Sequence, residues 1–324
     1  MKVCRVACVV VSYGSHVLLE DCLGSIAKQT RTADRVIVVE NGPRSIALEA
    51  RWSSLGVEFL FFGENLGFAR ANNLAVVHAD DCDLVALVNP DACLESDWLA
   101  VMLDAASAHQ ATASFASVLI RANDPGLCDG IGDAYHISGA AKRVGCGERL
   151  ATLDIRDREV FCASAAAALY RRSCFLAVGG FDQRYFCYFE DVDLGLRLRL
   201  AGYDCRLVAN ARASHIGSAT TGGQHSDFSV YYGHRNLEWT YFKSLPLVIV
   251  LVTLPAHMVL LAVTFIALLS RGQGRIYVKA KLDALFGLPG LWRSRRDVHS
   301  RRRVSLIAIW RLLDKSLSWP GGGR

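Results

Sequence analysis

The stretch Arg5-Val-Ala-Cys-Val-Val-Val-Ser12 is a short, valine-rich apolar run, and Arg35-Val-Ile-Val-Val-Glu40 repeats the pattern. Runs of this kind are typical of strands that are buried on both faces of a sheet. Residues 17–29, which lie between them, suit a helix. A strand, a helix and a second strand in this order favour a parallel sheet, whose ligands bind at the carboxyl ends of the strands.

The alternation continues along the chain. We expect a third strand over residues 57–62, a helix over 69–79 and a fourth strand over 84–88. The loops after the strands carry polar residues that should converge on one crevice, and these are Ser12, Glu40, Glu64 and Asp91. Residues 121–160 are rich in glycine and charge, which predicts irregular loops over the site or a small antiparallel excursion.

A second informative stretch is Tyr188-Phe-Glu-Asp-Val-Asp193, which places three carboxylates in four positions beside aromatic residues. Leucines alternate with polar residues after it, as in a strand, but Leu194, Leu198 and Ala201 also fall at helical spacing and Gly202 suits a helix end. We therefore expect a helix. Its acidic start fits the positive end of a helix dipole, and it equally fits a general base whose proton affinity is raised by aromatic neighbours.

Composition limits the class of protein. The 324 residues are 52% hydrophobic with a net charge of +5, and residues 271–324 hold thirteen Lys or Arg against three Asp, so the basicity belongs to the tail. Eleven cysteines lie without any Cys-x-x-Cys pair, mostly in apolar runs, which indicates reduced core thiols. The short apolar N-terminus lacks a small-residue cleavage site, so we expect the chain to stay in the cytosol.

Residues 247–269 form an apolar run that could span a bilayer core as one helix of roughly 30 Å or more. A single crossing would place the basic tail outside, against the positive-inside tendency. Pro255 could divide the run into a hairpin or an in-plane pair with both flanks on the cytosolic face. The basic residues would then face anionic headgroups, and they are Arg271, Arg275, Lys279, Lys281, Arg293, Arg295, Arg296 and Arg301–Arg303.

Two alternatives remain open for this region, namely a buried core helix and, for the basic run, a nucleic-acid patch. No nucleic-acid module accompanies the run, so we expect no nucleic-acid partner. The predicted organisation is a catalytic domain over residues 1–245 and a membrane-associating segment of apolar helices and basic tail over residues 246–324.

Seven segments in order resemble family 2 inverting glycosyltransferases, above all their bacterial rhamnosyltransferase-like branch. The segments are Val9-Val-Val-Ser-Tyr-Gly14, Val36-Ile-Val-Val-Glu-Asn-Gly42, Glu64-Asn-Leu-Gly-Phe-Ala-Arg-Ala-Asn-Asn73, Leu87-Val-Asn-Pro-Asp91, Asp129-Gly-Ile-Gly-Asp133 with Cys162-Ala-Ser-Ala-Ala-Ala-Ala-Leu-Tyr-Arg171, the run 178–203 around Glu190-Asp191, and Ala213-Ser-His-Ile-Gly-Ser218. The resemblance covers roughly residues 5–245. It implies an α/β GT-A-type nucleotide-diphospho-sugar transferase fold with a mostly parallel central sheet.

The resemblance also implies site residues. The nucleotide pocket would hold Ser12, Tyr13, Glu40, Asn65, Gly67, Asn73 and Asn89. Glu40 departs from the family's usual Asp, so the choice between uridine and thymidine stays open. Asp91 and His215 would hold Mg²⁺ or Mn²⁺, which stabilises charge on the leaving diphosphate. Asp191 would be the base that deprotonates the acceptor, supported by Glu190 and by Asp193, which could orient Arg197 or Arg199.

The function that this resemblance implies is inverting transfer of a sugar, with L-rhamnose from dTDP-rhamnose as the leading donor. The acceptor would be a glycan or lipid-linked glycan of bacterial surface polysaccharide, at the cytoplasmic face of the inner membrane. A UDP-sugar donor and a non-catalytic, membrane-bound nucleotide-sugar-binding scaffold are the alternatives. A dehydrogenase is disfavoured because Ser12-Tyr-Gly-Ser-His16 lacks the Gly-x-Gly-x-x-Gly fingerprint.

Overall fold

The computed structural model describes residues 4–14, 16–217, 223 and 225–316, so Ser218 of the predicted histidine motif and the last eight residues of the tail lie outside it. Strands and helices alternate first as β1 (Val6–Ser12), α1 (His16–Ala27), β2 (Arg35–Glu40), α2 (Ile46–Ser53), β3 (Val57–Phe61), α3 (Gly67–His78) and β4 (Leu84–Val88). Then follow β5 (Ala92–Leu94), α4 (Trp98–Ala108), β6 (Ser114–Arg121), β7 (Cys128–Gly130), β8 (Asp133–Tyr135), β9 (Ala141–Arg143), β10 (Arg158–Val160), β11 (Ala167–Arg171), α5 (Arg172–Ala177), α6 (Glu190–Leu200) and β12 (Cys205–His215). The last elements are α7 (Asp227–Ser244), α8 (Leu247–Ser270), α9 (Gly274–Ser300) and α10 (Leu306–Leu312).

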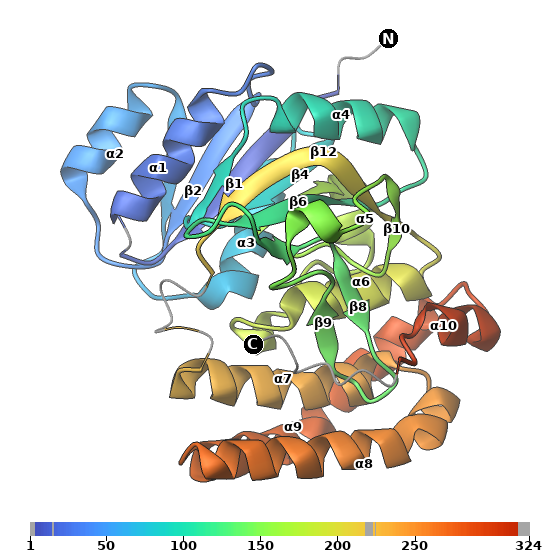
Figure 1. Ribbon diagram of the computed structural model, residues 1–324. Coiled ribbons are helices and arrows are strands. Elements are labelled where there is room, and N and C mark those ends of the chain that lie inside the picture. The colour runs from blue at the N-terminus through green and yellow to red at the C-terminus, as the bar shows by residue number, and fades with distance from the viewer. Residues whose placement is uncertain (1–3, 15, 218–222, 224, 317–324) are drawn as a thin grey trace.

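A central sheet organises the first two thirds of the chain (Figure 1), in the order β10-β12-β6-β11-β4-β1-β2-β3. Strands β3, β2, β1 and β4 are parallel, and β12 is parallel to β6, whereas β11 runs antiparallel to its neighbours β4 and β6. The predicted α/β fold is therefore confirmed. The glycine-rich segment contains the small antiparallel excursion that the sequence predicts, because β8 and β9 form a separate hairpin.

Strand β1 shows why its sequence is almost continuously apolar. Val6, Cys8 and Val10 pack into the core beneath α1 and α4, while Ala7 and Val9 pack into the core on the α3 side. Neither face of the strand reaches water, which favours apolar residues on both faces up to Ser12 at its end. Burial ends at the loop after Ser12, where Tyr13 is exposed.

Residues 190–200 form helix α6, as helical spacing predicts, and the helix ends before Gly202 with its φ of +90°. Leu194 and Leu198 contribute to the sheet core. Val192, Leu196 and Leu200 contribute to a different cluster, shared with the C-terminal helices. Apolar residues alternate with polar ones in this segment, as in a strand, because one face of the helix packs on the sheet core and another face packs on the C-terminal helices.

The C-terminal helices form a further layer, and Figure 1 shows α8 on the outer side of α7, away from the sheet, with α9 leading from there to α10. Helix α8 continues through Pro255, and the chain reverses at residues 271–273. The expectation of a break at Pro255 is therefore wrong, and the hairpin is formed by α8 and α9. Ile249 of α8 and Ile309 of α10 share an apolar cluster with Tyr135 of β8, while the proposed division after residue 245 stays a prediction.

Two basic residues of the tail, Lys281 and Arg295, are mostly buried against other elements, which corrects the expectation that they face lipid headgroups. Arg295 is buried and donates to the carbonyl oxygens of Lys243 (3.3 Å) and Leu245 (2.7 Å). The Lys281 Nζ atom donates to Glu238 Oε1 at 2.5 Å, and the other carboxylate oxygen of Glu238 lies 3.0 Å from His257 Nε2. Both cations join α9 to α7, because a buried charge needs partners.

A buried ionic network joins α6 to α7. The Lys243 Nζ atom lies 2.8 Å from both Asp182 Oδ2 and Asp193 Oδ1, and the second Asp193 oxygen accepts from Arg197 Nε at 2.8 Å. Burial raises the pKa of Asp193, but the positive charges of Arg197 and Lys243 lower it by more than burial raises it. The net pKa therefore lies below its usual range. The network holds α6 against the C-terminal layer.

Replacing Lys243 by Met should lower the free energy of unfolding by about 3–5 kcal/mol, because Asp193 would keep a buried charge with one cation fewer. Urea-induced unfolding monitored by circular dichroism measures this. Lys279→Met removes an exposed lysine that pairs with Asp283 and should leave the unfolding midpoint unchanged. Equal midpoints for the two variants would show that the Lys243 contacts contribute little.

Candidate functional site

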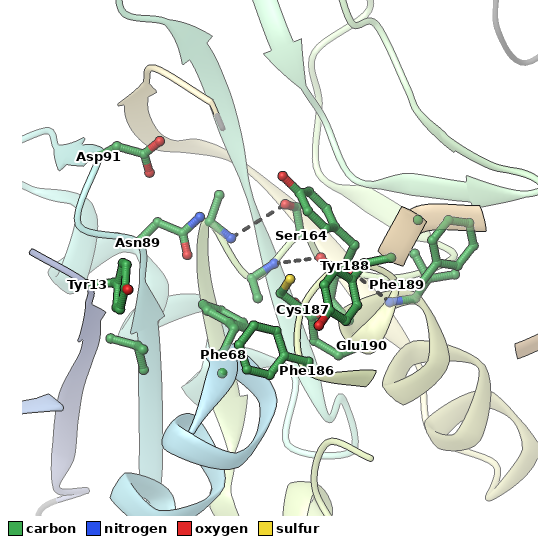
Figure 2. Close-up of a pocket in the computed structure, with 18 of the residues that line it drawn as sticks. Tyr13, Phe68, Asn89, Asp91, Ser164, Phe186, Cys187, Tyr188, Phe189 and Glu190 are labelled. Atoms are coloured by element: carbon green, nitrogen blue, oxygen red, sulfur yellow. Dashed lines mark hydrogen bonds between the residues drawn. The ribbon is translucent and has the colours of Figure 1, made fainter. Parts of the chain in front are cut away.

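The carboxyl ends of β1, β2 and β4 meet at a cavity of about 740 Å³. Figure 2 shows Tyr13, Asn89 and Asp91 on one side of this cavity, with Phe186, Tyr188, Phe189 and Glu190 across from them. The other walls come from Asp133 and Arg143 of the β8–β9 hairpin and from the first turns of α7. The parallel sheet therefore brings its polar loops to one crevice, as expected.

A smaller cavity of about 500 Å³ adjoins the first and shares Tyr13, Asn41 and Asn65 with it. Tyr13 is 53% exposed here, and Phe61 lies beneath the Arg44 guanidinium at 3.9 Å. Glu40 also lines this cavity, but its Oε1 atom accepts from the backbone N–H groups of Gly42 (2.7 Å) and Gly14 (3.3 Å). An aromatic wall beside a fixed carboxylate has the dimensions and chemistry for a nucleobase.

Ser12 and Asn89 each contribute a polar atom to the lining of the main cavity. The Ser12 Oγ and Asn89 Oδ1 atoms are buried and make no hydrogen bond within the described part of the chain. Buried polar atoms are nearly always paired in proteins, so unpaired ones in a cavity indicate a ligand.

The Asn-Leu-Gly segment has a more structural role than expected. Asn65 Oδ1 accepts from the Gly67 N–H at 2.9 Å, which forms the turn, and both residues line the cavity. Gly67 has a φ of +71°, and a Cβ there would lie 2.5 Å from the Phe186 ring. Glycine is therefore needed for the packing of Phe186.

Asn73 is not brought to the cavity. Its amide donates to the Phe181 carbonyl and accepts from the Phe181 N–H, both at 2.8 Å. Both ends of the side chain are thus used to hold the Gly-Phe turn before the acidic run. This geometry does not support the expected contact between Asn73 and a nucleotide.

Asp91 and His215 meet at the metal position that the resemblance implies. His215 Nε2 lies 3.4 Å from Asp91 Oδ1, and His215 Nδ1 lies 2.7 Å from Asp129 Oδ2. Burial lowers the pKa of His215, but Asp129 and Asp91 raise it more, so its net pKa is raised. Within the described ranges no three His, Cys, Asp or Glu side chains form a complete ligand set.

The residues nevertheless fit a divalent cation in a nucleotide-diphosphate site. Such ions take one or two protein ligands and complete their shell with phosphate and water. Asp129 would fix the His215 tautomer from outside that shell, as carboxylates commonly do for metal-binding histidines. Asp129 is held in turn by Arg143 Nη1 at 2.7 Å.

The three carboxylates of the acidic run have different surroundings. Asp193 is used in the buried network with Lys243 and Arg197. Asp191 lines the cavity, where Oδ2 accepts from the Ala165 N–H (3.2 Å) and Oδ1 from the Val192 N–H (2.8 Å). Burial raises the pKa of Asp191, despite these bonds and the charge of Arg143, and burial also raises that of Glu190. The geometry thus removes Asp193 from the candidates for a base.

The backbone before α6 is strained. Phe186, Tyr188 and Phe189 have φ values of 65°, 65° and 68°, a region that bulky side chains rarely adopt. Each costs about 1–3 kcal/mol and persists only where neighbours determine it. The buried Asn236 amide supplies this constraint, because it donates to the carbonyl oxygens of Cys187 and Tyr188 at 2.8 Å.

The resemblance places the segment from Asp129 to Asp133 on the acceptor side without a role for either carboxylate, and sequence reasoning assigned no role to Arg143 or Asn236. The Asp-Gly-x-Gly-Asp motif was the available signal for the two carboxylates. Arg143 and Asn236 had none, since their partners lie 14 and 48–51 residues away.

Asp133 should make stability depend on pH. Burial raises its pKa, the negative charges of Asp191 and Asp129 raise it further, and the positive charge of Arg143 lowers it. The net pKa rises from 3.8 to about 7. Between these values the folded chain binds more protons than the unfolded chain, so stability is full below about pH 4 and is lost as pH rises through 7. The loss could reach about 4 kcal/mol.

Unfolding by urea between pH 5 and pH 8 tests this, with Asp133→Asn as the variant. The wild-type free energy of unfolding should fall over this range, and the variant should show a shallower dependence. Parallel curves would contradict the assignment to Asp133.

Comparison with known proteins finds similar rhamnosyltransferases in two bacteria. The N-acetylglucosaminyl-diphospho-decaprenol L-rhamnosyltransferase of Mycobacterium tuberculosis is 28% identical to this chain. The alignment covers 71% of this chain and 85% of that enzyme. The rhamnosyltransferase WbbL of Escherichia coli is 27% identical over 64% of this chain and 81% of its own.

Solved structures show the same fold. A mannosyltransferase of Pyrobaculum calidifontis in complex with GDP-Man and Mn²⁺ aligns with a TM-score of 0.54 at 18% identity, over 94% of this chain and 85% of that one. GalNAc-T7 with UDP, GalNAc and Mn²⁺ aligns with a TM-score of 0.59 at 14% identity, and this chain spans about half (48%) of that structure. The model of glycosyl transferase family 2 matches residues 7–178, and the chain belongs to that family.

Proposed function

We propose that this nucleotide-sugar glycosyltransferase transfers L-rhamnose from dTDP-rhamnose, with inversion, to a glycan or lipid-linked glycan of bacterial surface polysaccharide. The donor rests on the two rhamnosyltransferases at 27–28% identity, so a UDP-sugar is the outcome to test against it. The observation that carries the reaction is the placement of Asp191 and Glu190 in one cavity with the nucleotide-side loops. A scaffold without activity would not need a buried carboxylate of raised pKa there.

The proposed mechanism is a single displacement. The nucleobase occupies the cavity between Tyr13 and Phe61, and the diphosphate lies by Ser12, Asn89 and Asp91. Asp191 accepts the proton of the acceptor hydroxyl as its oxygen attacks the anomeric carbon. The carbon–oxygen bond to the diphosphate breaks, and the nucleotide diphosphate departs with the electron pair. No covalent enzyme intermediate forms.

Asp91 and His215 would hold Mg²⁺ or Mn²⁺. The ion would supply positive charge that stabilises the departing diphosphate. Asp129, 2.7 Å from His215 Nδ1, would keep the proton on that atom and leave Nε2 available to bind the ion. The two solved neighbours that were determined with Mn²⁺ support this choice of ion.

The variant Asp191→Asn should lower kcat by about 10²- to 10⁴-fold, because the amide cannot accept the proton, while nucleotide affinity is retained. Nucleotide diphosphate release from dTDP-, UDP- and GDP-sugars with Mg²⁺, Mn²⁺ or EDTA, in the presence of a lipid-linked acceptor, measures this. Asp97→Asn, an exposed residue at the start of α4, is the control and should behave as wild type. Unchanged release by the Asp191 variant would favour another base, and absence of all nucleotide binding would favour the scaffold.

We also propose that the α8–α9 hairpin lies on the cytoplasmic face of the membrane. Helix α8 is long and apolar enough to cross a bilayer, with mean hydropathy 2.4. Its two ends nevertheless pack on the rest of the chain, since Ile249 contributes to a cluster with Tyr135 and Leu268 to one with Val230 of α7. A helix bound to the catalytic side along its length is better suited to lie flat than to cross.

The outward face of the hairpin fits a lipid surface. On α8 the exposed residues include Leu251, Val252, Val259 and Ile266, at 56–66% exposure, and on α9 Phe286 is 80% exposed. Arg275, Lys279, Arg293 and Arg296 remain exposed along α9 and supply positive charge for anionic headgroups. A contiguous apolar face with a basic border is typical of helices that lie in the membrane interface.

The double variant Leu251→Glu with Ile266→Glu should abolish most binding to vesicles of phosphatidylethanolamine and phosphatidylglycerol, because two buried carboxylates oppose insertion. Flotation of protein with vesicles measures this. The control Leu55→Glu places the same charge at a 67% exposed leucine in the loop after α2, and should float like wild type. Equal flotation of all three proteins would exclude this face.

A further inference from the structure

An aromatic wall closes one end of the main cavity. Phe186 and Tyr188 come from the strained segment before α6, and Phe228 and Tyr232 come from the first turns of α7. The Phe186 and Tyr232 rings are near-parallel with centroids 5.3 Å apart, and the Phe228 ring lies 4.7 Å from Tyr232 and 6.4 Å from Tyr188. The four rings thus form one continuous aromatic surface inside a cavity that also carries the carboxylates of Asp91, Asp133 and Asp191.

The wall is held rigid by groups that do not enter the cavity. Asn236 donates to three carbonyl oxygens in and next to the strained segment, those of Tyr185, Cys187 and Tyr188. Arg235 adds bonds to the carbonyl oxygens of Arg184 and Tyr185. Left-handed backbone in bulky residues that neighbours hold in place clusters at ligand sites, where it pre-organises a surface.

Phe186 and Tyr188 of the wall lie across the cavity from the diphosphate loops, and Phe186 also packs against Gly67. Figure 2 shows Phe186, Tyr188 and Glu190 across the cavity from Tyr13, Asn89 and Asp91. In an in-line displacement the attacking group and the leaving group lie on opposite sides of the reacting carbon. A wall next to Glu190-Asp191 and opposite the diphosphate loops therefore faces the acceptor.

A polar group in the same cavity narrows the chemistry of the ligand. Asp133 Oδ1 is buried and, within the described residues, makes no hydrogen bond, while the residue as a whole is only 6% exposed. A purely apolar ligand would leave this oxygen unpaired at a cost. A nucleobase already has its own cavity beside Tyr13 and Phe61. A sugar ring offers both an apolar C–H face and hydroxyl donors.

We propose that the wall formed by Phe186, Tyr188, Phe228 and Tyr232 is the acceptor-sugar subsite. A pyranose ring of the acceptor packs its C–H face on Phe228 and Tyr232, and one of its hydroxyls donates to Asp133 Oδ1. This inference rests on the proposed glycosyl transfer, and it adds that a sugar ring is recognised directly, whatever carrier the glycan is attached to.

Saturation-transfer NMR with methyl N-acetylglucosaminide and methyl rhamnoside, each in the presence of dTDP or UDP, tests the subsite without turnover. Wild type should saturate the ring C–H protons of at least one glycoside. Tyr232→Ala should weaken that glycoside's affinity roughly tenfold, and Tyr232→Phe should retain it, since the ring supplies the contact. Nucleotide saturation should be unchanged in both variants, which also shows that they are folded.

The control is Tyr231→Ala, the neighbouring tyrosine, which points its hydroxyl to Asp283 of α9 at 2.6 Å. It should bind glycoside as wild type does. Equal glycoside affinity in Tyr232→Ala and wild type, or a wild type that saturates nucleotide but no glycoside, would overturn the subsite and leave the transferase proposal standing. A wild type that saturates no nucleotide would overturn the proposed function, and the subsite with it.

Discussion

The structure depends most on how Asp193 is paired. This carboxylate is fully buried in α6, and it is bound by Arg197 from its own helix, by Lys243 and Ser244 from α7 and by the hydroxyl of Tyr185. Because an unpaired charge at this depth would be very costly, α7 must pack on α6 in one register. That register places the first turns of α7 over the cavity and leaves the two preceding carboxylates, Glu190 and Asp191, to face it.

The same region shows how strain is distributed around the site. Three aromatic residues before α6 take left-handed backbone conformations, which Asn236 holds by hydrogen bonds from α7. Phe186 can adopt its position only because Gly67 at the start of α3 has no side chain. The pairing of Asp193 with Lys243 fixes α7, and α7 fixes the aromatic rings before α6. The position of Phe186 in turn requires glycine at position 67, more than a hundred residues earlier.

The C-terminal helices are part of this arrangement. Arg295 of α9 binds carbonyl oxygens at the end of α7, and Lys281 binds Glu238 within it. The β8–β9 hairpin, which carries Asp133 and Arg143 to the cavity, is packed against α8 and α10 through Tyr135. The helices proposed to meet the membrane thus also support the acceptor side of the site.

Much of this architecture follows from the sequence because local patterns encode it. The valine runs of β1 and β2, the polar loops after them and the spacing of Leu194 and Leu198 depend on period and burial alone, and these predictions agree with the fold. The sequence by itself also brought Asp91, His215 and Asp191 forward as site residues. It misjudged Pro255, because a proline in a helix that neighbours support need not end it.

Only the tertiary structure decided which carboxylate does what. Glu190, Asp191 and Asp193 are near neighbours in sequence, and no local pattern separates them. Their roles diverge because Lys243 approaches one of them from 50 residues away while Ala165 and Arg143 lie near another. Likewise Asn73 binds Phe181, 108 residues later, and Arg143 of β9 binds Asp129 of β7. Partners so distant along the chain are set by how the layers pack, a property that spacing in the sequence does not carry.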